Sequence, residues 1–417
     1  MPRLSPSELS TTFFLQMTAI ILACRAVGWA ARVWLGQPQV VGEMIAGVVL
    51  GPSLLGWLLP GVEAALFPAE SKKLLYVGAQ LGVGLYMFLI GLTFDRAEFG
   101  RSAGKAAVVS LGGMAAPFAV AALLVPAMLA HPGAGLFMPG VGQAQASLFL
   151  GAAIAITAFP MLARIIHERG LAHTRLGTLS LAAGAIGDAG AWVVVALVLA
   201  SLGAGPMVAV RAAGGGLAFA LVMALVAPRL LAPLARQAEG GAPGEGLTAL
   251  VLALFALCAW AMDAAGMHAV FGGFLLGTAM PRGAFGTALR ERLEPFATCF
   301  LLPIFFTYSG LNTQMQVLGQ TGLWGLTLMV LAAAILGKGG ACYLAARAVG
   351  ETHADALGIG ALMNARGLME LIIINIGLAH GIIGKTLFAM LVLMAIVTTL
   401  LATPLFAWGR GRSAAAS

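Results

Sequence analysis

Charged residues are the scarcest class in this sequence. Asp, Glu, Lys and Arg make up 9% of its 417 residues, whereas hydrophobic residues make up 60%. A soluble globular domain carries about 25% charged residues, so the composition excludes that class and predicts a polytopic membrane protein. The net charge of +7 does not indicate binding to nucleic acid. The basic residues lie in short loops between apolar runs, where they report orientation in the bilayer.

Cysteine is also rare, and its pattern excludes two kinds of site. Four cysteines lie singly in apolar runs, so their spacing predicts neither a disulfide framework nor a metal site: Cys24, Cys258, Cys299 and Cys342. The histidines show no metal-ligand spacing either, and we expect no cofactor and no enzymatic activity. Glycine, by contrast, is abundant at 56 residues, which suits membrane helices that pack backbone to backbone.

Long apolar runs occupy most of the chain and predict an all-α protein. A run of about 20 residues can span a bilayer as a helix, and about thirteen such runs can be placed. Their approximate bounds are 11–35, 39–58, 73–95, 104–130, 145–168, 173–201, 206–227, 246–265, 267–281, 297–313, 321–347, 353–380 and 384–409. Lys and Arg concentrate in alternate loops, including the interval 282–296. This bias predicts an N-terminus outside and a C-terminus inside the cytoplasmic (inner) membrane.

Three pairs of segments are similar in the same order along the chain. They are GEMIAGVVLGP from Gly42 with HAVFGGFLLGT from His268, FLIGL from Phe88 with YSGL from Tyr308, and the interrupted runs around Thr157 and Asn364. The first pair aligns Gly51 with Gly277. Mates lie seven helices apart and therefore cross the bilayer in opposite directions. This pattern predicts an inverted five-helix repeat with two crossed discontinuous helices, a layout of many secondary transporters.

The two interrupted runs would place half-helix ends inside the membrane. The first is broken by Thr157-Ala158-Phe159-Pro160 and the second around Asn364. Thr157 and Asn364 suit such breaks because their side chains can satisfy freed backbone groups. The alternative is that Pro160 merely kinks a packed helix.

One acid stands out between these breaks. Asp188 carries the only charge from Leu176 to Val210. A charge at bilayer depth costs roughly 2.5–3.5 kcal/mol on insertion scales, so it persists mainly where it faces a cavity or a partner. A buried carboxylate can hold a proton or a desolvated metal ion but not both, which is the logic of an antiporter. We therefore expect Asp188 to bind Na⁺ or K⁺ transiently; a carboxylate satisfied by neighbouring hydroxyls is the alternative.

Other charges within apolar runs are candidates for supporting roles. Lys338 either snorkels to the cytoplasmic face or faces the core as a partner or competitor of the cation. Arg366 lies too deep to snorkel, and we expect it to neutralise half-helix carbonyl ends and buried acids such as Glu370. Glu43 stands near a cytoplasmic helix start. There it could cap the helix or line the mouth of the ion pathway, and these roles are as plausible as a direct role in transport.

Several segments together resemble the monovalent cation:proton antiporter superfamily, in the branch of Kef-type and plant CHX-type exchangers. They are GQPQVVGEMIAGVVLGPSLLG, AITAFPMLARIIHERGL, GDAGAW, MHAVFGGFLLGTAMPRG and MNARGLMELIIINIGL. The resemblance implies a homodimer in the lipid bilayer, with a core bundle that moves against a dimerisation panel. It also implies that Asp188 matches the family's ion-binding aspartate, Lys338 its core lysine and Arg366 its buried basic position.

One position departs from that resemblance. Gly187 stands where relatives usually have Asp, Asn or Gln, so the acid that pairs with the lysine in two-acid members is missing. A single carboxylate predicts one-for-one, electroneutral exchange. The expected division is a panel at 1–100 and 246–315, a core at 104–201 and 321–409, and a linker helix and loop at 206–245. No C-terminal nucleotide-binding domain is expected.

The sequence thus predicts a monovalent cation/proton antiporter that works by alternating access and serves pH homeostasis. Its partners would be H⁺ with Na⁺ or K⁺. Two other classes stay open at this point. One is a channel-like K⁺ efflux system, and the other is a sodium-coupled symporter of organic anions on a similar fold.

Overall fold

The computed structural model describes residues 5–37, 39–93, 96–131, 134–171, 174–199, 206–236, 243–313, 315–320 and 323–414. These residues form helices and connecting turns, with a single isolated β-bridge between Phe137 and Ile383. Two backbone hydrogen bonds flank that bridge, from Met138 N to Ile382 O and from Gly384 N to Leu136 O. The prediction of an all-α protein is confirmed.

The first half of the chain contains nine helices among its described residues. They are α1 (Pro6–Leu35), α2 (Gln39–Leu50), α3 (Leu55–Leu58), α4 (Pro60–Leu66), α5 (Ser71–Thr93), α6 (Arg96–Leu129), α7 (Gln143–Ala155), α8 (Phe159–Glu168) and α9 (Arg175–Leu199). Local chemistry sets both ends of α1. Ser5 and Glu8 form a reciprocal capping box at its start, and Gly36 closes it with a positive φ of 60°.

The second half includes π-helical segments within longer helices. It contains α10 (Pro206–Leu221), η3 (Val222–Val226), α11 (Ala227–Arg236), α12 (Glu245–Ala264), α13 (Ala269–Ala279), α14 (Ala284–Phe296), η4 (Ala297–Leu301), α15 (Leu302–Leu311), α16 (Gln316–Gln320), α17 (Trp324–Ala332), η5 (Ala333–Gly340), α18 (Ala341–Ala348), α19 (His353–Leu362), α20 (Leu368–Ala379) and α21 (Lys385–Ala414). Eight helical segments of the described chain are long and apolar enough to cross a membrane, and α7 and α13 are shorter apolar helices. The multi-pass prediction is confirmed, while the count of thirteen stays a prediction.

Helix α14 differs from the sequence-based expectation. The interval 282–296, interpreted as a basic loop, is largely helical and continues through η4 into α15. Phe285, Leu289 and Leu293 recur every four residues and are buried on one side. Arg290 and Glu294 form a partly exposed ion pair at 2.8 Å. This spacing is typical of an amphipathic helix. The arginines in the interval had favoured a loop instead.

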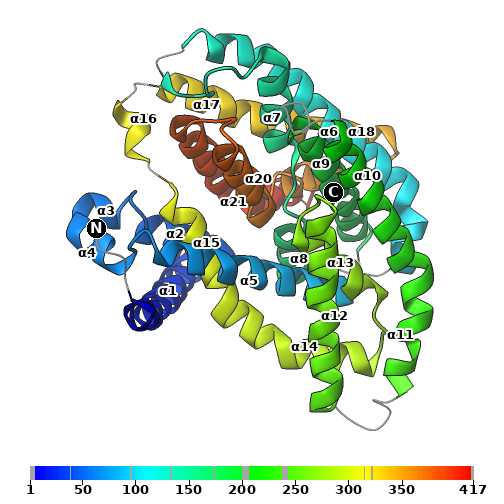
Figure 1. Cartoon of the computed structure of the whole chain (residues 1–417). Helices are drawn as coiled ribbons and strands as arrows, with labels where there is room; N and C mark the ends of the chain where they lie inside the picture. The colour runs from blue at the N-terminus through cyan, green and yellow to red at the C-terminus, as the bar shows by residue number, and fades with distance from the viewer. Residues whose placement is uncertain are drawn as a thin grey trace.

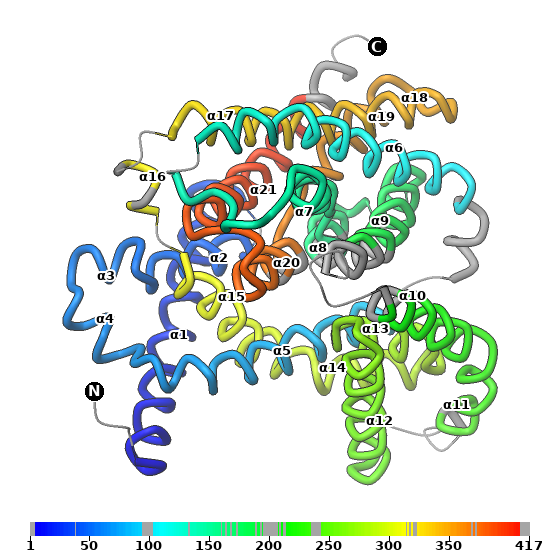
Figure 2. The backbone as a smooth tube through the Cα atoms, turned by 45° about the horizontal axis from the view of Figure 1, so that its top comes forward, coloured from blue at the N-terminus to red at the C-terminus, as the bar shows by residue number. Residues whose placement is uncertain are grey.

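The helices pack in two groups. We call α1, α2, α5, α12, α13 and α15 the panel group, and α6–α9 with η5 and α17–α21 the core group, because each set packs mainly within itself. Figures 1 and 2 show α20 and α21 lying between α2 and α15 on one side and α6, α7 and α17 on the other. The residue limits of the two expected domains stay a prediction.

The panel group is held by very close helix crossings at glycine. A Cβ added at Gly51 in α2 would lie 2.3 Å from the Gly310 carbonyl oxygen in α15. A Cβ at Gly277 in α13 would lie 2.1 Å from the Phe88 carbonyl oxygen in α5. No other residue fits at either crossing without a shift of the backbone. The two glycines that the sequence aligns thus make equivalent contacts, while the inverted repeat itself stays a prediction.

Candidate ion-translocation site

Two discontinuous helices cross in the core group. Helix α7 ends at Ala155 and α8 begins at Phe159, whereas α19 ends at Leu362 and α20 begins at Leu368. The intervening segments touch, because Ala158 N donates to Ala365 O at 3.1 Å. The alternative, in which Pro160 merely kinks a continuous helix, is wrong, since residues 156–158 are not helical.

The predicted residues Thr157 and Asn364 both satisfy backbone groups at these breaks. Thr157 Oγ1 donates to Met363 O at 3.0 Å and so caps the end of α19. Asn364 Nδ2 contacts Ile335 O and Gly360 O, each at 3.3 Å, and thereby joins the break to η5. Both side chains are buried.

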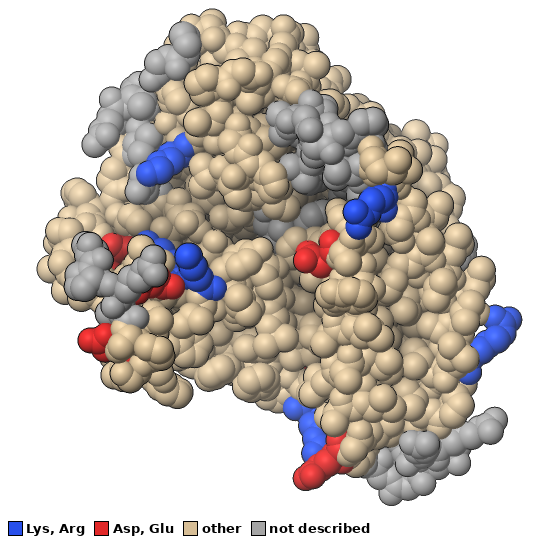
Figure 3. All heavy atoms as spheres, in the orientation of Figure 1, with Lys and Arg blue, Asp and Glu red and all other residues tan. Residues whose placement is uncertain are grey.

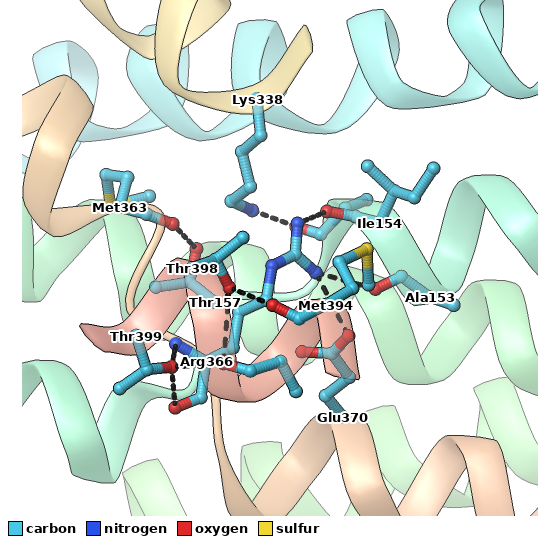
Figure 4. Close-up of polar contacts among 12 residues, drawn as sticks. Ala153, Ile154, Thr157, Lys338, Met363, Arg366, Glu370, Met394, Thr398 and Thr399 are labelled. Atoms are coloured by element: carbon cyan, nitrogen blue, oxygen red, sulfur yellow. Dashed lines mark hydrogen bonds and ion pairs between the residues drawn. The ribbon is translucent and has the colours of Figure 1, made fainter. Parts of the chain in front are cut away.

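Two buried cations occupy the carbonyl end of α7. The last four carbonyls of a helix lack intrahelical partners, and that end carries partial negative charge. Arg366 donates through Nη1 to Ala153 O at 2.8 Å and through Nη2 to Ile154 O at 2.6 Å. Lys338 Nζ donates to Ala155 O. Figure 4 shows both side chains converging on this helix end, so three successive carbonyls are neutralised.

Both cations are inaccessible to solvent. Arg366 is 0% exposed and Lys338 is 1% exposed. Lys338 lies within η5, and such π-helical insertions are frequent at functional sites. Its amine points to the crossing, which is the core-facing alternative rather than the snorkelling one (Figure 4).

The buried acid at the crossing is Glu370. It is fully buried in the first turn of α20, and its Oε1 lies 3.4 Å from Arg366 Nη1. Arg366 therefore contacts both carbonyl oxygens and an acid (Figure 4). Glu43 lies elsewhere, buried in α2, where Gln39 Nε2 donates to its Oε1 at 3.0 Å.

The side chain of Asp188 lies outside the described residues, although its backbone belongs to α9. Its neighbour Gly187 is buried and faces α6, since a Cβ there would lie 3.1 Å from Ser110 Oγ. Ser110 is itself buried, and its hydroxyl has no hydrogen-bond partner among the described residues. A hydroxyl group thus faces position 187.

Two threonines of α21 were missed by sequence reasoning. Thr399 Oγ1 accepts from Arg366 N at 2.9 Å and lies 2.9 Å from Arg366 O, to which it can donate. Thr398 Oγ1 donates to Met394 O within the helix. Both are buried, and Figure 4 shows them beside the crossing. The available signal was a pair of adjacent hydroxyls in an otherwise apolar run.

A charged cluster at one end of the core group was also missed. Glu351, in the turn between α18 and α19, accepts at Oε1 from Lys105 at 3.1 Å and from Arg175 at 2.7 Å. The acid is buried, whereas both bases are largely exposed. Burial raises the pKa of Glu351, but the hydrogen bonds from Arg175 and Lys105 outweigh burial and leave the pKa below its ordinary value.

A cavity of about 960 Å³ opens between the panel and core groups. Panel residues Tyr76, Asp263 and Asn312 line it together with Asn375 of α20. Asn312 Nδ2 and Asn375 Oδ1 lie 3.4 Å apart across the boundary between the groups. Figure 3 shows the surface hollowed where α5, α13, α15 and α20 meet. The cavity is large enough for a hydrated ion to enter.

Crossed broken helices with buried charges at the crossing define a membrane protein of the secondary-transporter type. Comparison with known proteins identifies the family. A model described as sodium/hydrogen exchanger, transmembrane, matches residues 18–408. The chain therefore belongs to this family, and the predicted superfamily is confirmed.

The chain is similar to named members of this family. It is 37% identical over 380 residues to Na(+)/H(+) antiporter NhaS4 of Synechocystis sp., covering 88% of this chain and 90% of that protein. It is 34% identical to Cation/H(+) antiporter 18 of Arabidopsis thaliana, covering 94% of this chain and 48% of that protein, about half its length. The structure of the sodium proton antiporter MjNhaP1 from Methanocaldococcus jannaschii at pH 8 matches 97% of this chain with a TM-score of 0.65 and 16% identity. That likeness shows a shared fold.

Proposed function

We propose that this protein exchanges Na⁺ or K⁺ for H⁺ across the membrane by alternating access. Membership of the sodium/hydrogen exchanger family and the names of its relatives support antiport. The observation that carries the proposal is the crossing of two broken helices with Lys338, Arg366 and Glu370 buried around it. Buried charges at membrane depth are costly and mark ion pathways.

The charges around the crossing favour a single exchanging carboxylate. When ionised, Arg366 and Lys338 contribute two positive charges and Glu370 one negative charge, which leaves one positive charge in excess among these three groups at the crossing. We propose that Asp188, on α9 beside α7, supplies the balancing negative charge. A proton or a monovalent cation bound there changes the charge of the site equally. This equivalence supports electroneutral, one-for-one exchange.

Access alternates, in this proposal, because the core group moves against the panel group. The cavity lined by Tyr76, Asp263 and Asn375 gives access from one side between the two groups. The panel group is the proposed homodimer contact. The concentration of basic residues in alternate loops supports a C-terminus on the cytoplasmic side.

The decisive experiment measures dissipation of a pH gradient in proteoliposomes with Na⁺, K⁺ or Li⁺ added in turn. Asp188→Asn keeps the shape of the side chain but holds no exchangeable charge, and we expect it to abolish exchange. Glu245→Gln is the control, because Glu245 is exposed at the start of α12, the opposite end of that helix from the cavity-lining Asp263, and its loss leaves exchange in place. Exchange by Asp188→Asn at the parent rate contradicts the proposal.

Two further measurements in the same proteoliposomes test the stoichiometry and the coupling of exchange. Dependence of the exchange rate on membrane potential contradicts electroneutral stoichiometry. Cation flux without any change of pH contradicts antiport and favours a channel-like efflux system.

A further inference from the structure

One carbonyl group in α21 lacks its normal helical donor. In an α-helix, each carbonyl oxygen accepts from the N–H of the residue four positions later. Pro404 lies inside α21, and proline has no N–H. The carbonyl of Leu400 is therefore deprived of that hydrogen bond, in a segment of the core group where water is scarce.

The panel group supplies the missing donor. Gln37 follows the glycine cap of α1, and its Nε2 donates to Leu400 O at 3.0 Å. The Gln37 side chain is buried, and its Oε1 has no hydrogen-bond partner among the described residues. Among the described residues, the hydrogen bond to Leu400 O is therefore the polar contact that holds the Gln37 side chain in place.

This contact lies away from the large cavity, next to Thr399, which bonds Arg366 at the crossing of the broken helices. The chain runs from Gln37 through α2 to the start of α5, which, with Lys72 and Lys73, lines the cavity. Helix α21 runs away from the cavity. It begins near the cavity-lining residue Ala379, and Leu400 lies half-way along it. The two groups are therefore separated by the cavity, which Asn312 and Asn375 span at one point, and are joined again by Gln37 and Leu400 away from it.

We infer that the hydrogen bond from Gln37 to Leu400 O is a latch that holds the core group against the panel group on the side of the crossing away from the cavity. Pro404 favours this bond, because the carbonyl has no helical N–H that competes for it. Alternating access requires this bond to break each time the site opens on the Gln37 side, so Gln37 is a positioning residue for the exchange cycle. The inference rests on the proposed movement of the two groups.

The latch can be removed from either side. Gln37→Ala removes the donor, and Pro404→Ala gives Leu400 O a partner within its own helix. A thiol reporter at the latch, Leu400→Cys, keeps the backbone carbonyl; it is built with Cys299→Ser, because Cys299 is the exposed native cysteine. We expect either variant to raise the labelling rate by a water-soluble maleimide about fivefold, equivalent to about 1 kcal/mol at 1.4 kcal/mol per tenfold.

The double variant separates a latch from two unrelated disturbances. Both substitutions remove the same hydrogen bond, so labelling of Gln37→Ala/Pro404→Ala should exceed neither single variant. Gln16→Ala is the matched control: Gln16 is also a buried glutamine, but it bonds Leu66 O and Ser71 within the panel side. It should leave labelling unchanged.

Labelling needs no transport, so the two proposals fail separately. An unchanged labelling rate in Gln37→Ala or Pro404→Ala, or additive effects in the double variant, overturns the latch even where antiport is intact. Absence of cation/proton exchange by the parent protein overturns the proposed function instead.

Discussion

The glycine crossings of the panel group and the crossing of the broken helices in the core group are packed in different ways. In the panel group, glycines such as Gly51 and Gly277 bring backbones within reach of carbonyl oxygens on the next helix. At the core crossing, long charged side chains from Arg366 and Lys338 fill the space and neutralise a broken helix end. Direct backbone contact leaves little freedom to rearrange. Side chains that can exchange partners suit the region where ions are expected to bind.

Removal of a core charge should produce the largest effect. Arg366→Met leaves Glu370 and two α7 carbonyls without their cationic partner, and breaking a buried pair in this way costs about 3–5 kcal/mol. We expect a large drop in the midpoint of thermal unfolding in detergent. Arg290→Met, which breaks a partly exposed pair with Glu294, should cost at most about 1 kcal/mol. Equal losses in the two variants would contradict the special cost of removing the buried cation at the crossing.

Overfilling a panel crossing should have an intermediate effect. Gly277→Ala places a methyl group against the Phe88 carbonyl, and overpacking of this kind costs about 1–3 kcal/mol. Gly214→Ala is the matched control, because nothing lies within 4 Å of its Cβ position in α10, and alanine favours a helix by about 1 kcal/mol there. Unfolding midpoints should therefore move in opposite directions. A neutral Gly277→Ala contradicts tight panel packing.

The smallest effect should come from the Glu351 cluster. Because Arg175 and Lys105 depress its folded-state pKa, Glu351 stabilises the protein above its ordinary value of 4.5. That stability is lost as the pH falls through the lower folded value. We expect at most about 1 kcal/mol, since both bases are largely exposed to solvent. The unfolding midpoint of Glu351→Gln should be lower than that of the parent near neutral pH and converge with it in acid; a constant gap contradicts this role.

Features that interrupt an apolar run could be predicted from the sequence. Thr157, Asn364 and Arg366 stand out because polar groups at membrane depth need partners, and the structure brings all three to one crossing. The glycine alignment likewise identified positions of close packing, Gly51 and Gly277.

Carbonyl partners were expected for Arg366, but the carbonyls that bind Lys338 and Gln37 could not be predicted. These carbonyls become available only because α7 stops at Ala155 and because Pro404 lies one turn beyond Leu400. Such groups depend on tertiary placement and leave no distinctive residue type in the sequence. Helix α14 was missed for another reason. Its arginines predicted a basic loop, and they outweighed the four-residue spacing of the apolar residues on its buried side.

The short β-bridge between Phe137 and Ile383 has a mechanical consequence. It ties the segment that leads into α7 to the turn that leaves α20. The same two discontinuous helices are already joined where Ala158 bonds to Ala365. The two discontinuous helices are therefore joined at two separate points along their length. A displacement of either helix should move the other with it.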